Sequence, residues 1–285
     1  MKHSLVQRAD NSFYSKIQSL ESNEIKTEKI FFLPSWEETD RAIPNHIARS
    51  SLFSPIARGT RILLDKEVIA SRSDVTIMFS GKQLDEADCD VWMQTLHEAR
   101  FEPLGSNIKI NRARFLKVLG RAKGSSGYKW LHDCLERLAF AMISVETKNY
   151  SIGMKPGYKV LHLIEGFNFD SVKGGYNIRI DPEARKLFSR SEFALVDWRK
   201  RMQIKSSIDM AKWLQRIIAT SSDVVQRYAI EELKIRMNYS GQWSKFRLAL
   251  GLAMNELERL DIISGSRIEK SKSGRLQVAW TRVRK

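Results

Sequence analysis

The feature that most constrains this fold is the order of helical and strand patterns in residues 206–280. Apolar residues recur there at helical spacing in three segments, and two apolar β-type runs follow. The runs, Ile262-Ile263 and Leu276–Trp280, flank the turn Lys272-Ser273-Gly274. Three helices followed by a β-hairpin are typical of a winged helix-turn-helix unit. The three helical segments begin at Ser206, Tyr228 and Gln242.

A similar order occurs earlier in the chain. Three helical patterns are followed there by β-type runs, and a Gly/Ser/Lys-rich stretch precedes the last helix, as a turn requires. We therefore predict an α+β fold with two tandem winged-helix domains, each a helix-turn-helix plus a β-hairpin. The segments are helices at 84–100, 112–120 and 126–140, and strands at 108–110, 141–145, 160–164 and 176–180.

The region before these segments contains a tail, a helix and a strand pair. Residues 1–30 are polar and lack a hydrophobic period, which is typical of a flexible N-terminal tail. Pro44 at a permissive first turn predicts a helix that runs to Phe53. The β-branched runs between Arg61 and Phe79 predict two paired strands.

Positive charge is concentrated near the C-terminus. The chain carries a formal net charge of +15, and residues 196–285 contain 19 Lys and Arg against nine Asp and Glu. Such an excess indicates a polyanionic partner that meets the C-terminal part. We therefore predict a flexible tail (1–30), a first winged-helix domain (31–180) that contacts the DNA backbone, and a second (181–285) for sequence-specific binding to double-stranded DNA. Dimerisation is assigned to the first domain as well, because exposed apolar residues in its strands suit self-association at an unpaired edge.

Membrane and disulfide-rich classes are excluded by the sequence. No run approaches the roughly 18 consecutive apolar residues of a spanning helix, and the N-terminus lacks the apolar core of a secretory signal. Cys89 and Cys134 stand too far apart for a zinc ribbon and are expected to be buried, reduced thiols. We expect a cytoplasmic protein without membrane contact.

The sequence also lacks the motifs of the enzyme classes that act on nucleotides or DNA. The Gly-rich stretch 120–129 does not spell a phosphate-binding P-loop, and no His-x-x-Arg box of a tyrosine recombinase follows residue 195. The histidines are scattered, so each is expected to be structural, and we predict no enzyme activity, no metal and no cofactor. The histidines are His3, His46, His97, His132 and His162.

The predicted base-reading residues lie at the start of the segment 242–260. Phe246, Ala249, Leu250, Ala253 and Leu257 form its apolar stripe, which leaves its N-terminal half exposed on the other side. Gln suits adenine and Arg or Lys suits guanine in the major groove. Ser240 and Gly241 form the turn before this helix, and Ser240 can cap it. The exposed base-reading residues are Gln242, Ser244, Lys245 and Arg247.

Further basic residues are predicted to contact the DNA backbone. The C-terminal hairpin is expected to present basic side chains at its tip, where they meet phosphates without reading sequence. The basic residues of the first domain are not mixed with the Asn, Gln and Ser residues that read bases. They are therefore expected either to contact the DNA backbone or simply to face solvent. The backbone set comprises Ser240, Arg267, Lys270, Lys272 and Arg275 in the second domain and Arg112, Lys117, Arg121, Lys123 and Lys129 in the first.

Several stretches resemble the TrfA-type plasmid replication initiators. The run Pro44-Asn45-x-x-Ala48-Arg49-Ser50-x-Leu52-Phe53 is the most specific of them. The likeness extends from about residue 31 to the C-terminus, whereas the clamp-binding pentapeptide of the family is replaced here by Thr27–Phe32. The other stretches are 33–43, 77–85 and 90–92.

The resemblance implies a function for the predicted DNA-binding surfaces. Such initiators have two winged-helix domains, bind iteron repeats at a plasmid origin and open the adjacent AT-rich duplex. They recruit the host initiator and the replicative helicase, and their homodimer is in equilibrium with an origin-binding monomer. A transcriptional repressor without replication activity is the alternative that the same surfaces allow, and a DNA-processing enzyme is a more distant one.

Overall fold

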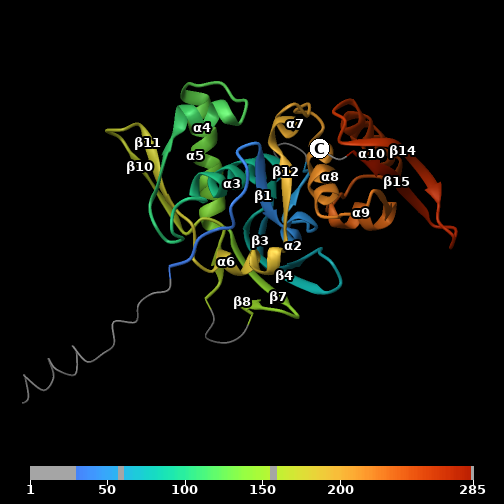
Figure 1. Cartoon of the computed structure of the whole chain (residues 1–285), viewed down its shortest axis with the longest axis horizontal. Coiled ribbons are helices and arrows are strands. Elements are labelled where there is room, and N and C mark those ends of the chain that lie inside the picture. Colours follow the sequence, from blue (N-terminus) through green and yellow to red (C-terminus); the bar gives the residue numbers. More distant parts are fainter. Residues whose placement is uncertain (1–29, 57–60, 155–158, 284–285) are drawn as a thin grey trace, which may run out of the picture. The chain divides into compact units, whose positions relative to one another are not determined.

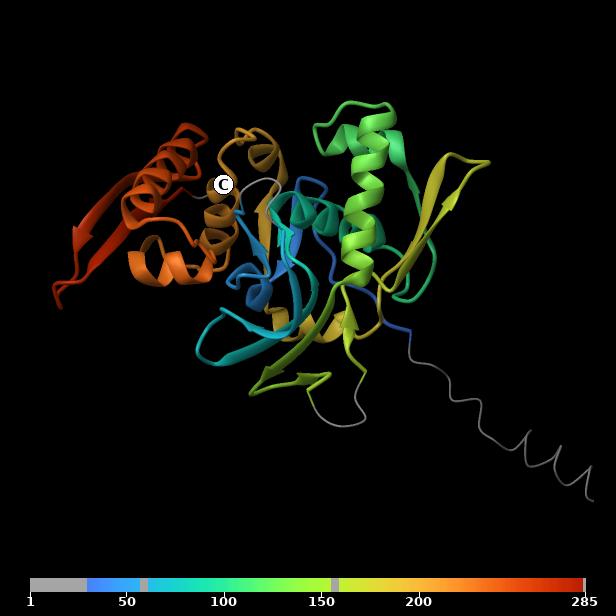
Figure 2. The ribbon, with the colours of Figure 1, turned by 180° about the vertical axis from the view of Figure 1, so that it is seen from behind.

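The structure, a computed structural model, describes residues 30–56, 61–154 and 159–283, which form both helices and strands (Figures 1 and 2). The prediction of an α+β fold is confirmed. The expected flexible tail lies outside the described residues except for Ile30. Among the described residues, buried apolar side chains form two clusters, a first core from Leu33 to Trp198 and a second core from Ile204 to Trp280.

The largest sheet belongs to the first core and has the strand order β3-β4-β7-β8. The predicted strand pair before Phe79 is present as β3 and β4. The predicted pairing of the runs 141–145 and 160–164 is also confirmed, because β9 pairs with β7. The strands are β3 (Leu63–Ile69), β4 (Val75–Lys82), β7 (Met142–Thr147), β8 (Ser151–Ile152) and β9 (Leu161–His162).

Beside this sheet, three helices and a smaller sheet form the first helical unit. Its sheet has the order β10-β11-β6, so the strand between the first two helices pairs with the second strand of a hairpin. The strands at 141–147 therefore do not supply this hairpin, because β7 pairs with β4 instead. The elements are α3 (Glu86–Ala99), β6 (Ile108–Asn111), α4 (Arg112–Val118), α5 (Ser125–Phe140), β10 (Gly166–Asp170) and β11 (Gly175–Arg179).

The second core repeats this connectivity near the C-terminus. Its sheet has the order β13-β15-β14, and again the strand after the first helix pairs with the second hairpin strand. The helix predicted from Tyr228 begins at Ile230, because the residues before it pair with β15. The elements are α8 (Asp209–Ala219), β13 (Val225–Ala229), α9 (Ile230–Arg236), α10 (Trp243–Arg259), β14 (Ile263–Lys270) and β15 (Leu276–Arg282).

Short elements close the first core and lead into the second. The antiparallel pair of β1 and β12 joins the start of the first core to its end, which places residues 181–198 with that core. The helix predicted from Pro44 to Phe53 is much shorter, because Phe53 enters a strand that pairs with β5. These elements are β1 (Asp40–Pro44), α2 (Asn45–Ala48), β2 (Phe53–Ser54), β5 (Leu84–Asp85), α6 (Ala184–Leu187), β12 (Phe193–Asp197) and α7 (Trp198–Met202).

The acidic start of α3 has more than a capping role. Asp85 is the N-cap and forms a capping box with Asp88, as expected for carboxylates at a helix start. Asp88 also accepts hydrogen bonds from Arg61 at 2.8 Å and from Arg137 at 2.7 Å. Its carboxylate thereby connects α3 to α5 and to the segment before β3.

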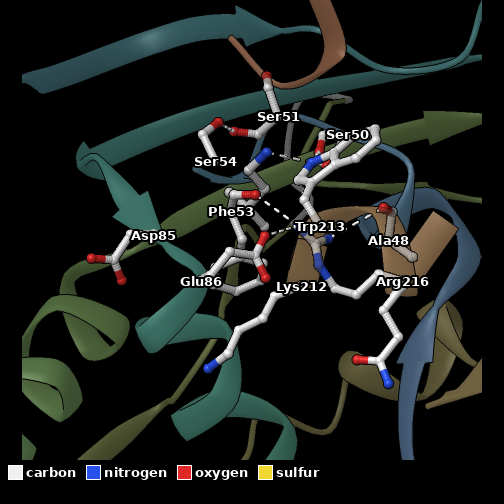
Figure 3. A network of polar contacts seen from close by, with 12 residues as sticks. Ala48, Ser50, Ser51, Phe53, Ser54, Asp85, Glu86, Lys212, Trp213 and Arg216 are labelled. Carbon is white, nitrogen blue, oxygen red and sulfur yellow. Dashed lines mark hydrogen bonds and ion pairs between the residues drawn. The ribbon is translucent and has the colours of Figure 1, made fainter. Parts of the chain in front are cut away.

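Glu86, in the first turn of α3, is the centre of a buried ionic network (Figure 3). Its carboxylate accepts hydrogen bonds from Arg201 of α7, at 2.8 Å, and from Arg216 of α8. All three side chains are fully buried. Arg216 also donates to the carbonyl oxygens of Phe53, at 2.7 Å, and Ala48, at 3.2 Å. The network therefore connects the first core to α8 of the second.

Asp90 extends this network by one helical turn. It accepts hydrogen bonds from Arg201 and from Lys212 of α8. Burial alone would raise the pKa of Asp90, but the charges of Arg201 and Lys212 hold that pKa below its usual value. Burial would likewise lower the pKa of Arg201, whereas Asp90 and Glu86 raise it. Each buried charge is therefore compensated by a neighbour of opposite sign.

Replacing Glu86 tests the importance of this network. We expect Glu86→Gln to lower the free energy of unfolding by about 3 to 5 kcal/mol, because two buried guanidinium groups would lose their shared counter-charge. Glu136→Gln is the matched control, since Glu136 is an exposed glutamate on α5, and its effect should stay within about 0.5 kcal/mol. Chemical denaturation measures both, and equal effects would contradict the role given to Glu86.

Candidate nucleic-acid interface

The helix α10 exposes the predicted base-reading residues on its N-terminal half. Gln242, Ser244, Lys245 and Arg247 are all exposed. The expected apolar stripe faces the second core: Phe246, Leu250, Ala253 and Leu257 are buried, and Ala249 is partly buried against the core. Burial of this stripe fixes which side of the helix is available to a ligand. Contacts of the exposed residues with bases stay a prediction.

The turn before α10 is shaped by its glycine and a neighbouring aromatic ring. A Cβ atom at Gly241 would lie 2.7 Å from Cε1 of Tyr239, so a side chain at this position would displace the ring. That ring packs on Phe246 with 5.0 Å between the centroids. The prediction that Ser240 caps the helix is wrong, because the N-cap is Gln242, two residues later. Ser240 is nevertheless exposed beside the helix start.

The hairpin β14–β15 carries basic side chains around the predicted turn. Lys270, Lys272 and Arg275 are exposed at or next to its tip, where Gly274 has a φ of +80°. Arg267 lies further down β14 and shares Glu269 with Arg227, at 2.7 and 3.1 Å. Its expected place at the tip is therefore wrong.

The electrostatic character of this region comes from an absence of acidic residues in the sequence. No Asp or Glu occurs between Glu232 and Glu256, whereas Lys234, Arg236, Lys245 and Arg247 lie in that interval. The interval includes the turn and most of α10. An anion that approaches the N-terminal half of α10 thus meets no carboxylate from this segment, which favours a polyanionic ligand there.

The basic residues predicted in the first domain gather around α4 and α5. Arg112, Lys117 and Arg121 lie on or after α4, and Lys123 and Lys129 lie before and on α5. All are exposed except Arg112, which is half-buried. Lys129 pairs with Asp133 one turn later, at 3.1 Å. The structure thus brings the first-domain set together, although it does not establish contact with DNA.

Aromatic partners of these arginines escaped the sequence analysis. The Arg112 guanidinium lies 3.9 Å from the ring centroid of Tyr128 and 4.9 Å from that of Phe169, and Arg121 lies 3.5 Å from that of Trp130. Such stacking holds a guanidinium against a ring face and leaves its N–H donors at the edge. Only the fold brings Phe169 to Arg112, so no local spacing could have revealed that pair.

A cluster of arginines between the two cores is a second feature that the sequence analysis missed. Arg49, Arg72, Arg227 and Arg236 line one pocket together with Tyr228. Three of them have carboxylate partners, namely Asp74 for Arg72, Glu269 for Arg227 and Glu232 for Arg236. Arg49 donates instead to Thr220 Oγ1 and to the Thr220 carbonyl oxygen, at 2.6 and 2.7 Å. These partners give the cluster a structural role.

The described cysteines and histidines are embedded in the protein. Cys89 and Cys134 are buried free thiols, as predicted, and burial raises the pKa of Cys89 to about 12. Burial, together with Arg41 and Arg100, lowers the pKa of His97 to about 4, and His97 accepts a hydrogen bond from Trp36 Nε1. Within the described residues, no group of three or more His, Cys, Asp or Glu is placed to hold a metal ion.

The helices of the described part of the chain are all too short or too polar to cross a membrane.

The fold is similar to that of solved structures of domains 2 and 3 of RctB. One crystal structure, of a selenomethionine derivative, superposes with a TM-score of 0.54 and 14% identity, over 81% of this chain and 95% of that chain. A second crystal structure of the same domains gives a TM-score of 0.53 and 12% identity, over 83% and 96%. This likeness concerns the arrangement of helices and strands alone.

Family comparison then places the sequence among plasmid replication initiators. The family model described as TrfA protein matches residues 8–269, so the chain belongs to the TrfA family. The plasmid replication initiator protein TrfA of Escherichia coli is 27% identical over 176 residues. That alignment covers 60% of this chain and 45% of the relative, so the matched part is less than half of the relative's length.

Gly241, just before α10, and Gly251, in the middle of α10, provide a paired test of this geometry. We expect Gly241→Ala to lower the free energy of unfolding by about 1 to 3 kcal/mol, because the new Cβ would push the Tyr239 ring off Phe246. Gly251→Ala should raise it by about 1 kcal/mol, since a Cβ there meets open space and Ala favours the helix. Denaturation with urea measures both, and effects of the same sign would contradict this description.

Proposed function

We propose that this protein initiates plasmid replication by binding iteron repeats of double-stranded DNA through two winged-helix units. Membership of the TrfA family is the observation that carries the proposal. No enzymatic activity, cofactor or metal is part of it. The protein acts instead by binding DNA and assembling other proteins on it, in the bacterial cytoplasm.

The connectivity of both units supports the winged-helix assignment. In each, a strand follows the first helix, two helices come next, and a hairpin returns so that its second strand pairs with that first strand. This order matches that of a helix-turn-helix extended by a β-hairpin wing. The third helices, α5 and α10, then take the position of recognition helices, and the hairpins β10–β11 and β14–β15 take that of wings.

The two units have different parts in the proposed complex. In the second unit, Gln242, Ser244, Lys245 and Arg247 read base edges, while Ser240 and the basic hairpin residues hold the phosphates. In the first, Arg112 and Arg121, with their stacked guanidinium groups, and the lysines of α4 and α5 contact the DNA backbone. The concentration of net positive charge after residue 196 supports this division.

Self-association belongs to the largest sheet of the first core in this proposal. The strand β3 lies at the edge of its sheet and exposes Leu63 and Val68. An exposed edge strand with apolar side chains is a ready template for pairing with another chain. We infer that a homodimer forms there and is in equilibrium with a monomer that binds the origin. Opening of the AT-rich duplex and recruitment of the host initiator and helicase follow once the repeats are bound.

Binding and replication assays test this function. Purified protein should bind the repeats of its cognate origin at physiological salt far more tightly than scrambled DNA, as a base-reading protein must. The protein supplied in trans should also maintain a plasmid that carries this origin. Equal affinity for scrambled DNA would refute sequence-specific binding, and repeat binding without plasmid maintenance would identify a repressor. A site-specific nick in supercoiled origin DNA would identify an enzyme.

Substitutions separate base reading from backbone contact. We expect Gln242→Ala or Arg247→Ala to relax specificity at one base position at a cost of about 1 to 3 kcal/mol. Lys272→Ala should weaken binding to all sequences alike and reduce the slope of log affinity against log salt by about one. Competition binding with single-base variants of the repeat measures both. Identical behaviour of the two classes would show that the helix and wing have been assigned wrongly.

A further inference from the structure

The outer face of α10 carries a leucine that the basic residues around it do not explain. The side chain of Leu248 is 68% exposed, whereas Leu250, two residues later on the same helix, is fully buried. Exposed apolar side chains are common when they stand singly on a surface. Leu248 differs because it directly follows Lys245 and Arg247 on the helix that we propose to face DNA.

Ser244 and Gly251, two of the neighbours of Leu248 on this face, are small, whereas Leu252, one turn later, is also an exposed leucine. Residues spaced by three or four positions share one side of a helix, so Ser244, Leu248 and Gly251 form a stripe opposite the buried residues of α10. A Cβ at Gly251 would meet nothing within 4 Å, although glycine weakens a helix interior by about 1 kcal/mol relative to alanine. No packing contact inside the protein accounts for this glycine, and its lack of a side chain leaves Leu248 accessible.

Positive charge flanks this stripe. Lys245 and Arg247 are exposed next to Leu248, and the segment between Glu232 and Glu256 contains no acidic residue. An apolar protein partner would gain little from such surroundings, whereas a DNA groove lined by phosphates complements them. Leu252, which is also exposed, differs from Leu248 because it lines a pocket with Pro55, Ile208 and Met210.

The major groove of DNA offers one apolar group at its floor, the C5 methyl of thymine. We propose that Leu248 recognises a thymine methyl group in each repeat and thereby determines specificity by apolar contact rather than by hydrogen bonding. This inference rests on the proposed function, because it requires α10 to lie in the major groove. It adds a thymine to the adenine and guanine contacts that the polar residues of α10 provide.

Replacing thymine by deoxyuridine tests the contact at the level of one methyl group. Deoxyuridine lacks only the C5 methyl and keeps the hydrogen bonds of thymine. Repeat duplexes would each carry one such replacement, and their affinity for the full-length protein would be measured. We expect one or two positions at which the loss of the methyl weakens binding by about four-fold, the value of one buried methylene-sized group.

The same duplexes are then measured with Leu248→Ala and with a control. Leu248→Ala should bind the thymine and deoxyuridine forms equally at the sensitive positions, because the side chain that senses the methyl is gone. Leu195→Ala is the matched control, since Leu195 is an exposed leucine on β12 outside the surfaces that we propose to bind DNA or a second copy, and it should keep the wild-type profile. Circular dichroism and urea denaturation of both variants verify that they fold.

The outcomes separate this inference from the proposed function. Wild-type protein that binds the repeats but is insensitive to deoxyuridine at every position would overturn the role of Leu248 and leave repeat binding intact. A Leu248→Ala variant with the wild-type sensitivity would also overturn it. A protein that fails to distinguish the repeats from scrambled DNA would instead refute the proposed function on which the inference rests.

Discussion

The arrangement of this protein depends on one buried carboxylate. Glu86 receives Arg201 and Arg216 in a site without solvent access, and each of these arginines has further acceptors, in Asp90 or in backbone carbonyl oxygens. Buried charges are costly unless they are paired and hydrogen-bonded, and here the two arginines that pair with Glu86 come from two different helices. The first turn of α3, the helix α7 and the helix α8 are thereby held together where the two cores meet.

The two halves of the proposed interface share one connectivity of helices and strands but carry different side chains. In both, the third helix and the hairpin follow the same order, but α10 presents polar and basic residues together with the exposed Leu248 and Leu252, whereas α5 is accompanied by arginines stacked on Tyr128 and Trp130. A stacked guanidinium has little freedom and suits a fixed backbone contact. Flexible polar side chains at a helix start suit discrimination between base edges.

Local patterns predicted the parts of this structure that are local in origin. The helical period identified α3, α4, α5 and α10. Pairing between distant segments was not predicted. Phe53, expected in a helix, lies in a strand that pairs with β5. The hairpin of the first unit is β10–β11 and not the pair of strands expected at 141–145 and 160–164. The apolar stripe of α10 was enough to predict which of its residues are exposed. The partners of Glu86 and Arg112 come from distant segments that tertiary packing brings together, so the spacing of residues along the chain could not predict them.

The Glu86 network also bears on how such proteins diversify. The helix α10, which we propose to read bases, shares its core with α8, and α8 supplies Arg216 and Lys212 to acceptors in the first core. A recombinant that joined the C-terminal half of one relative to the N-terminal half of another would bring foreign cations to Glu86 and Asp90. Under the proposed function, substitutions on the exposed face of α10 would change DNA specificity without altering this network, whereas an exchange of whole halves would have to keep its acidic and basic members together.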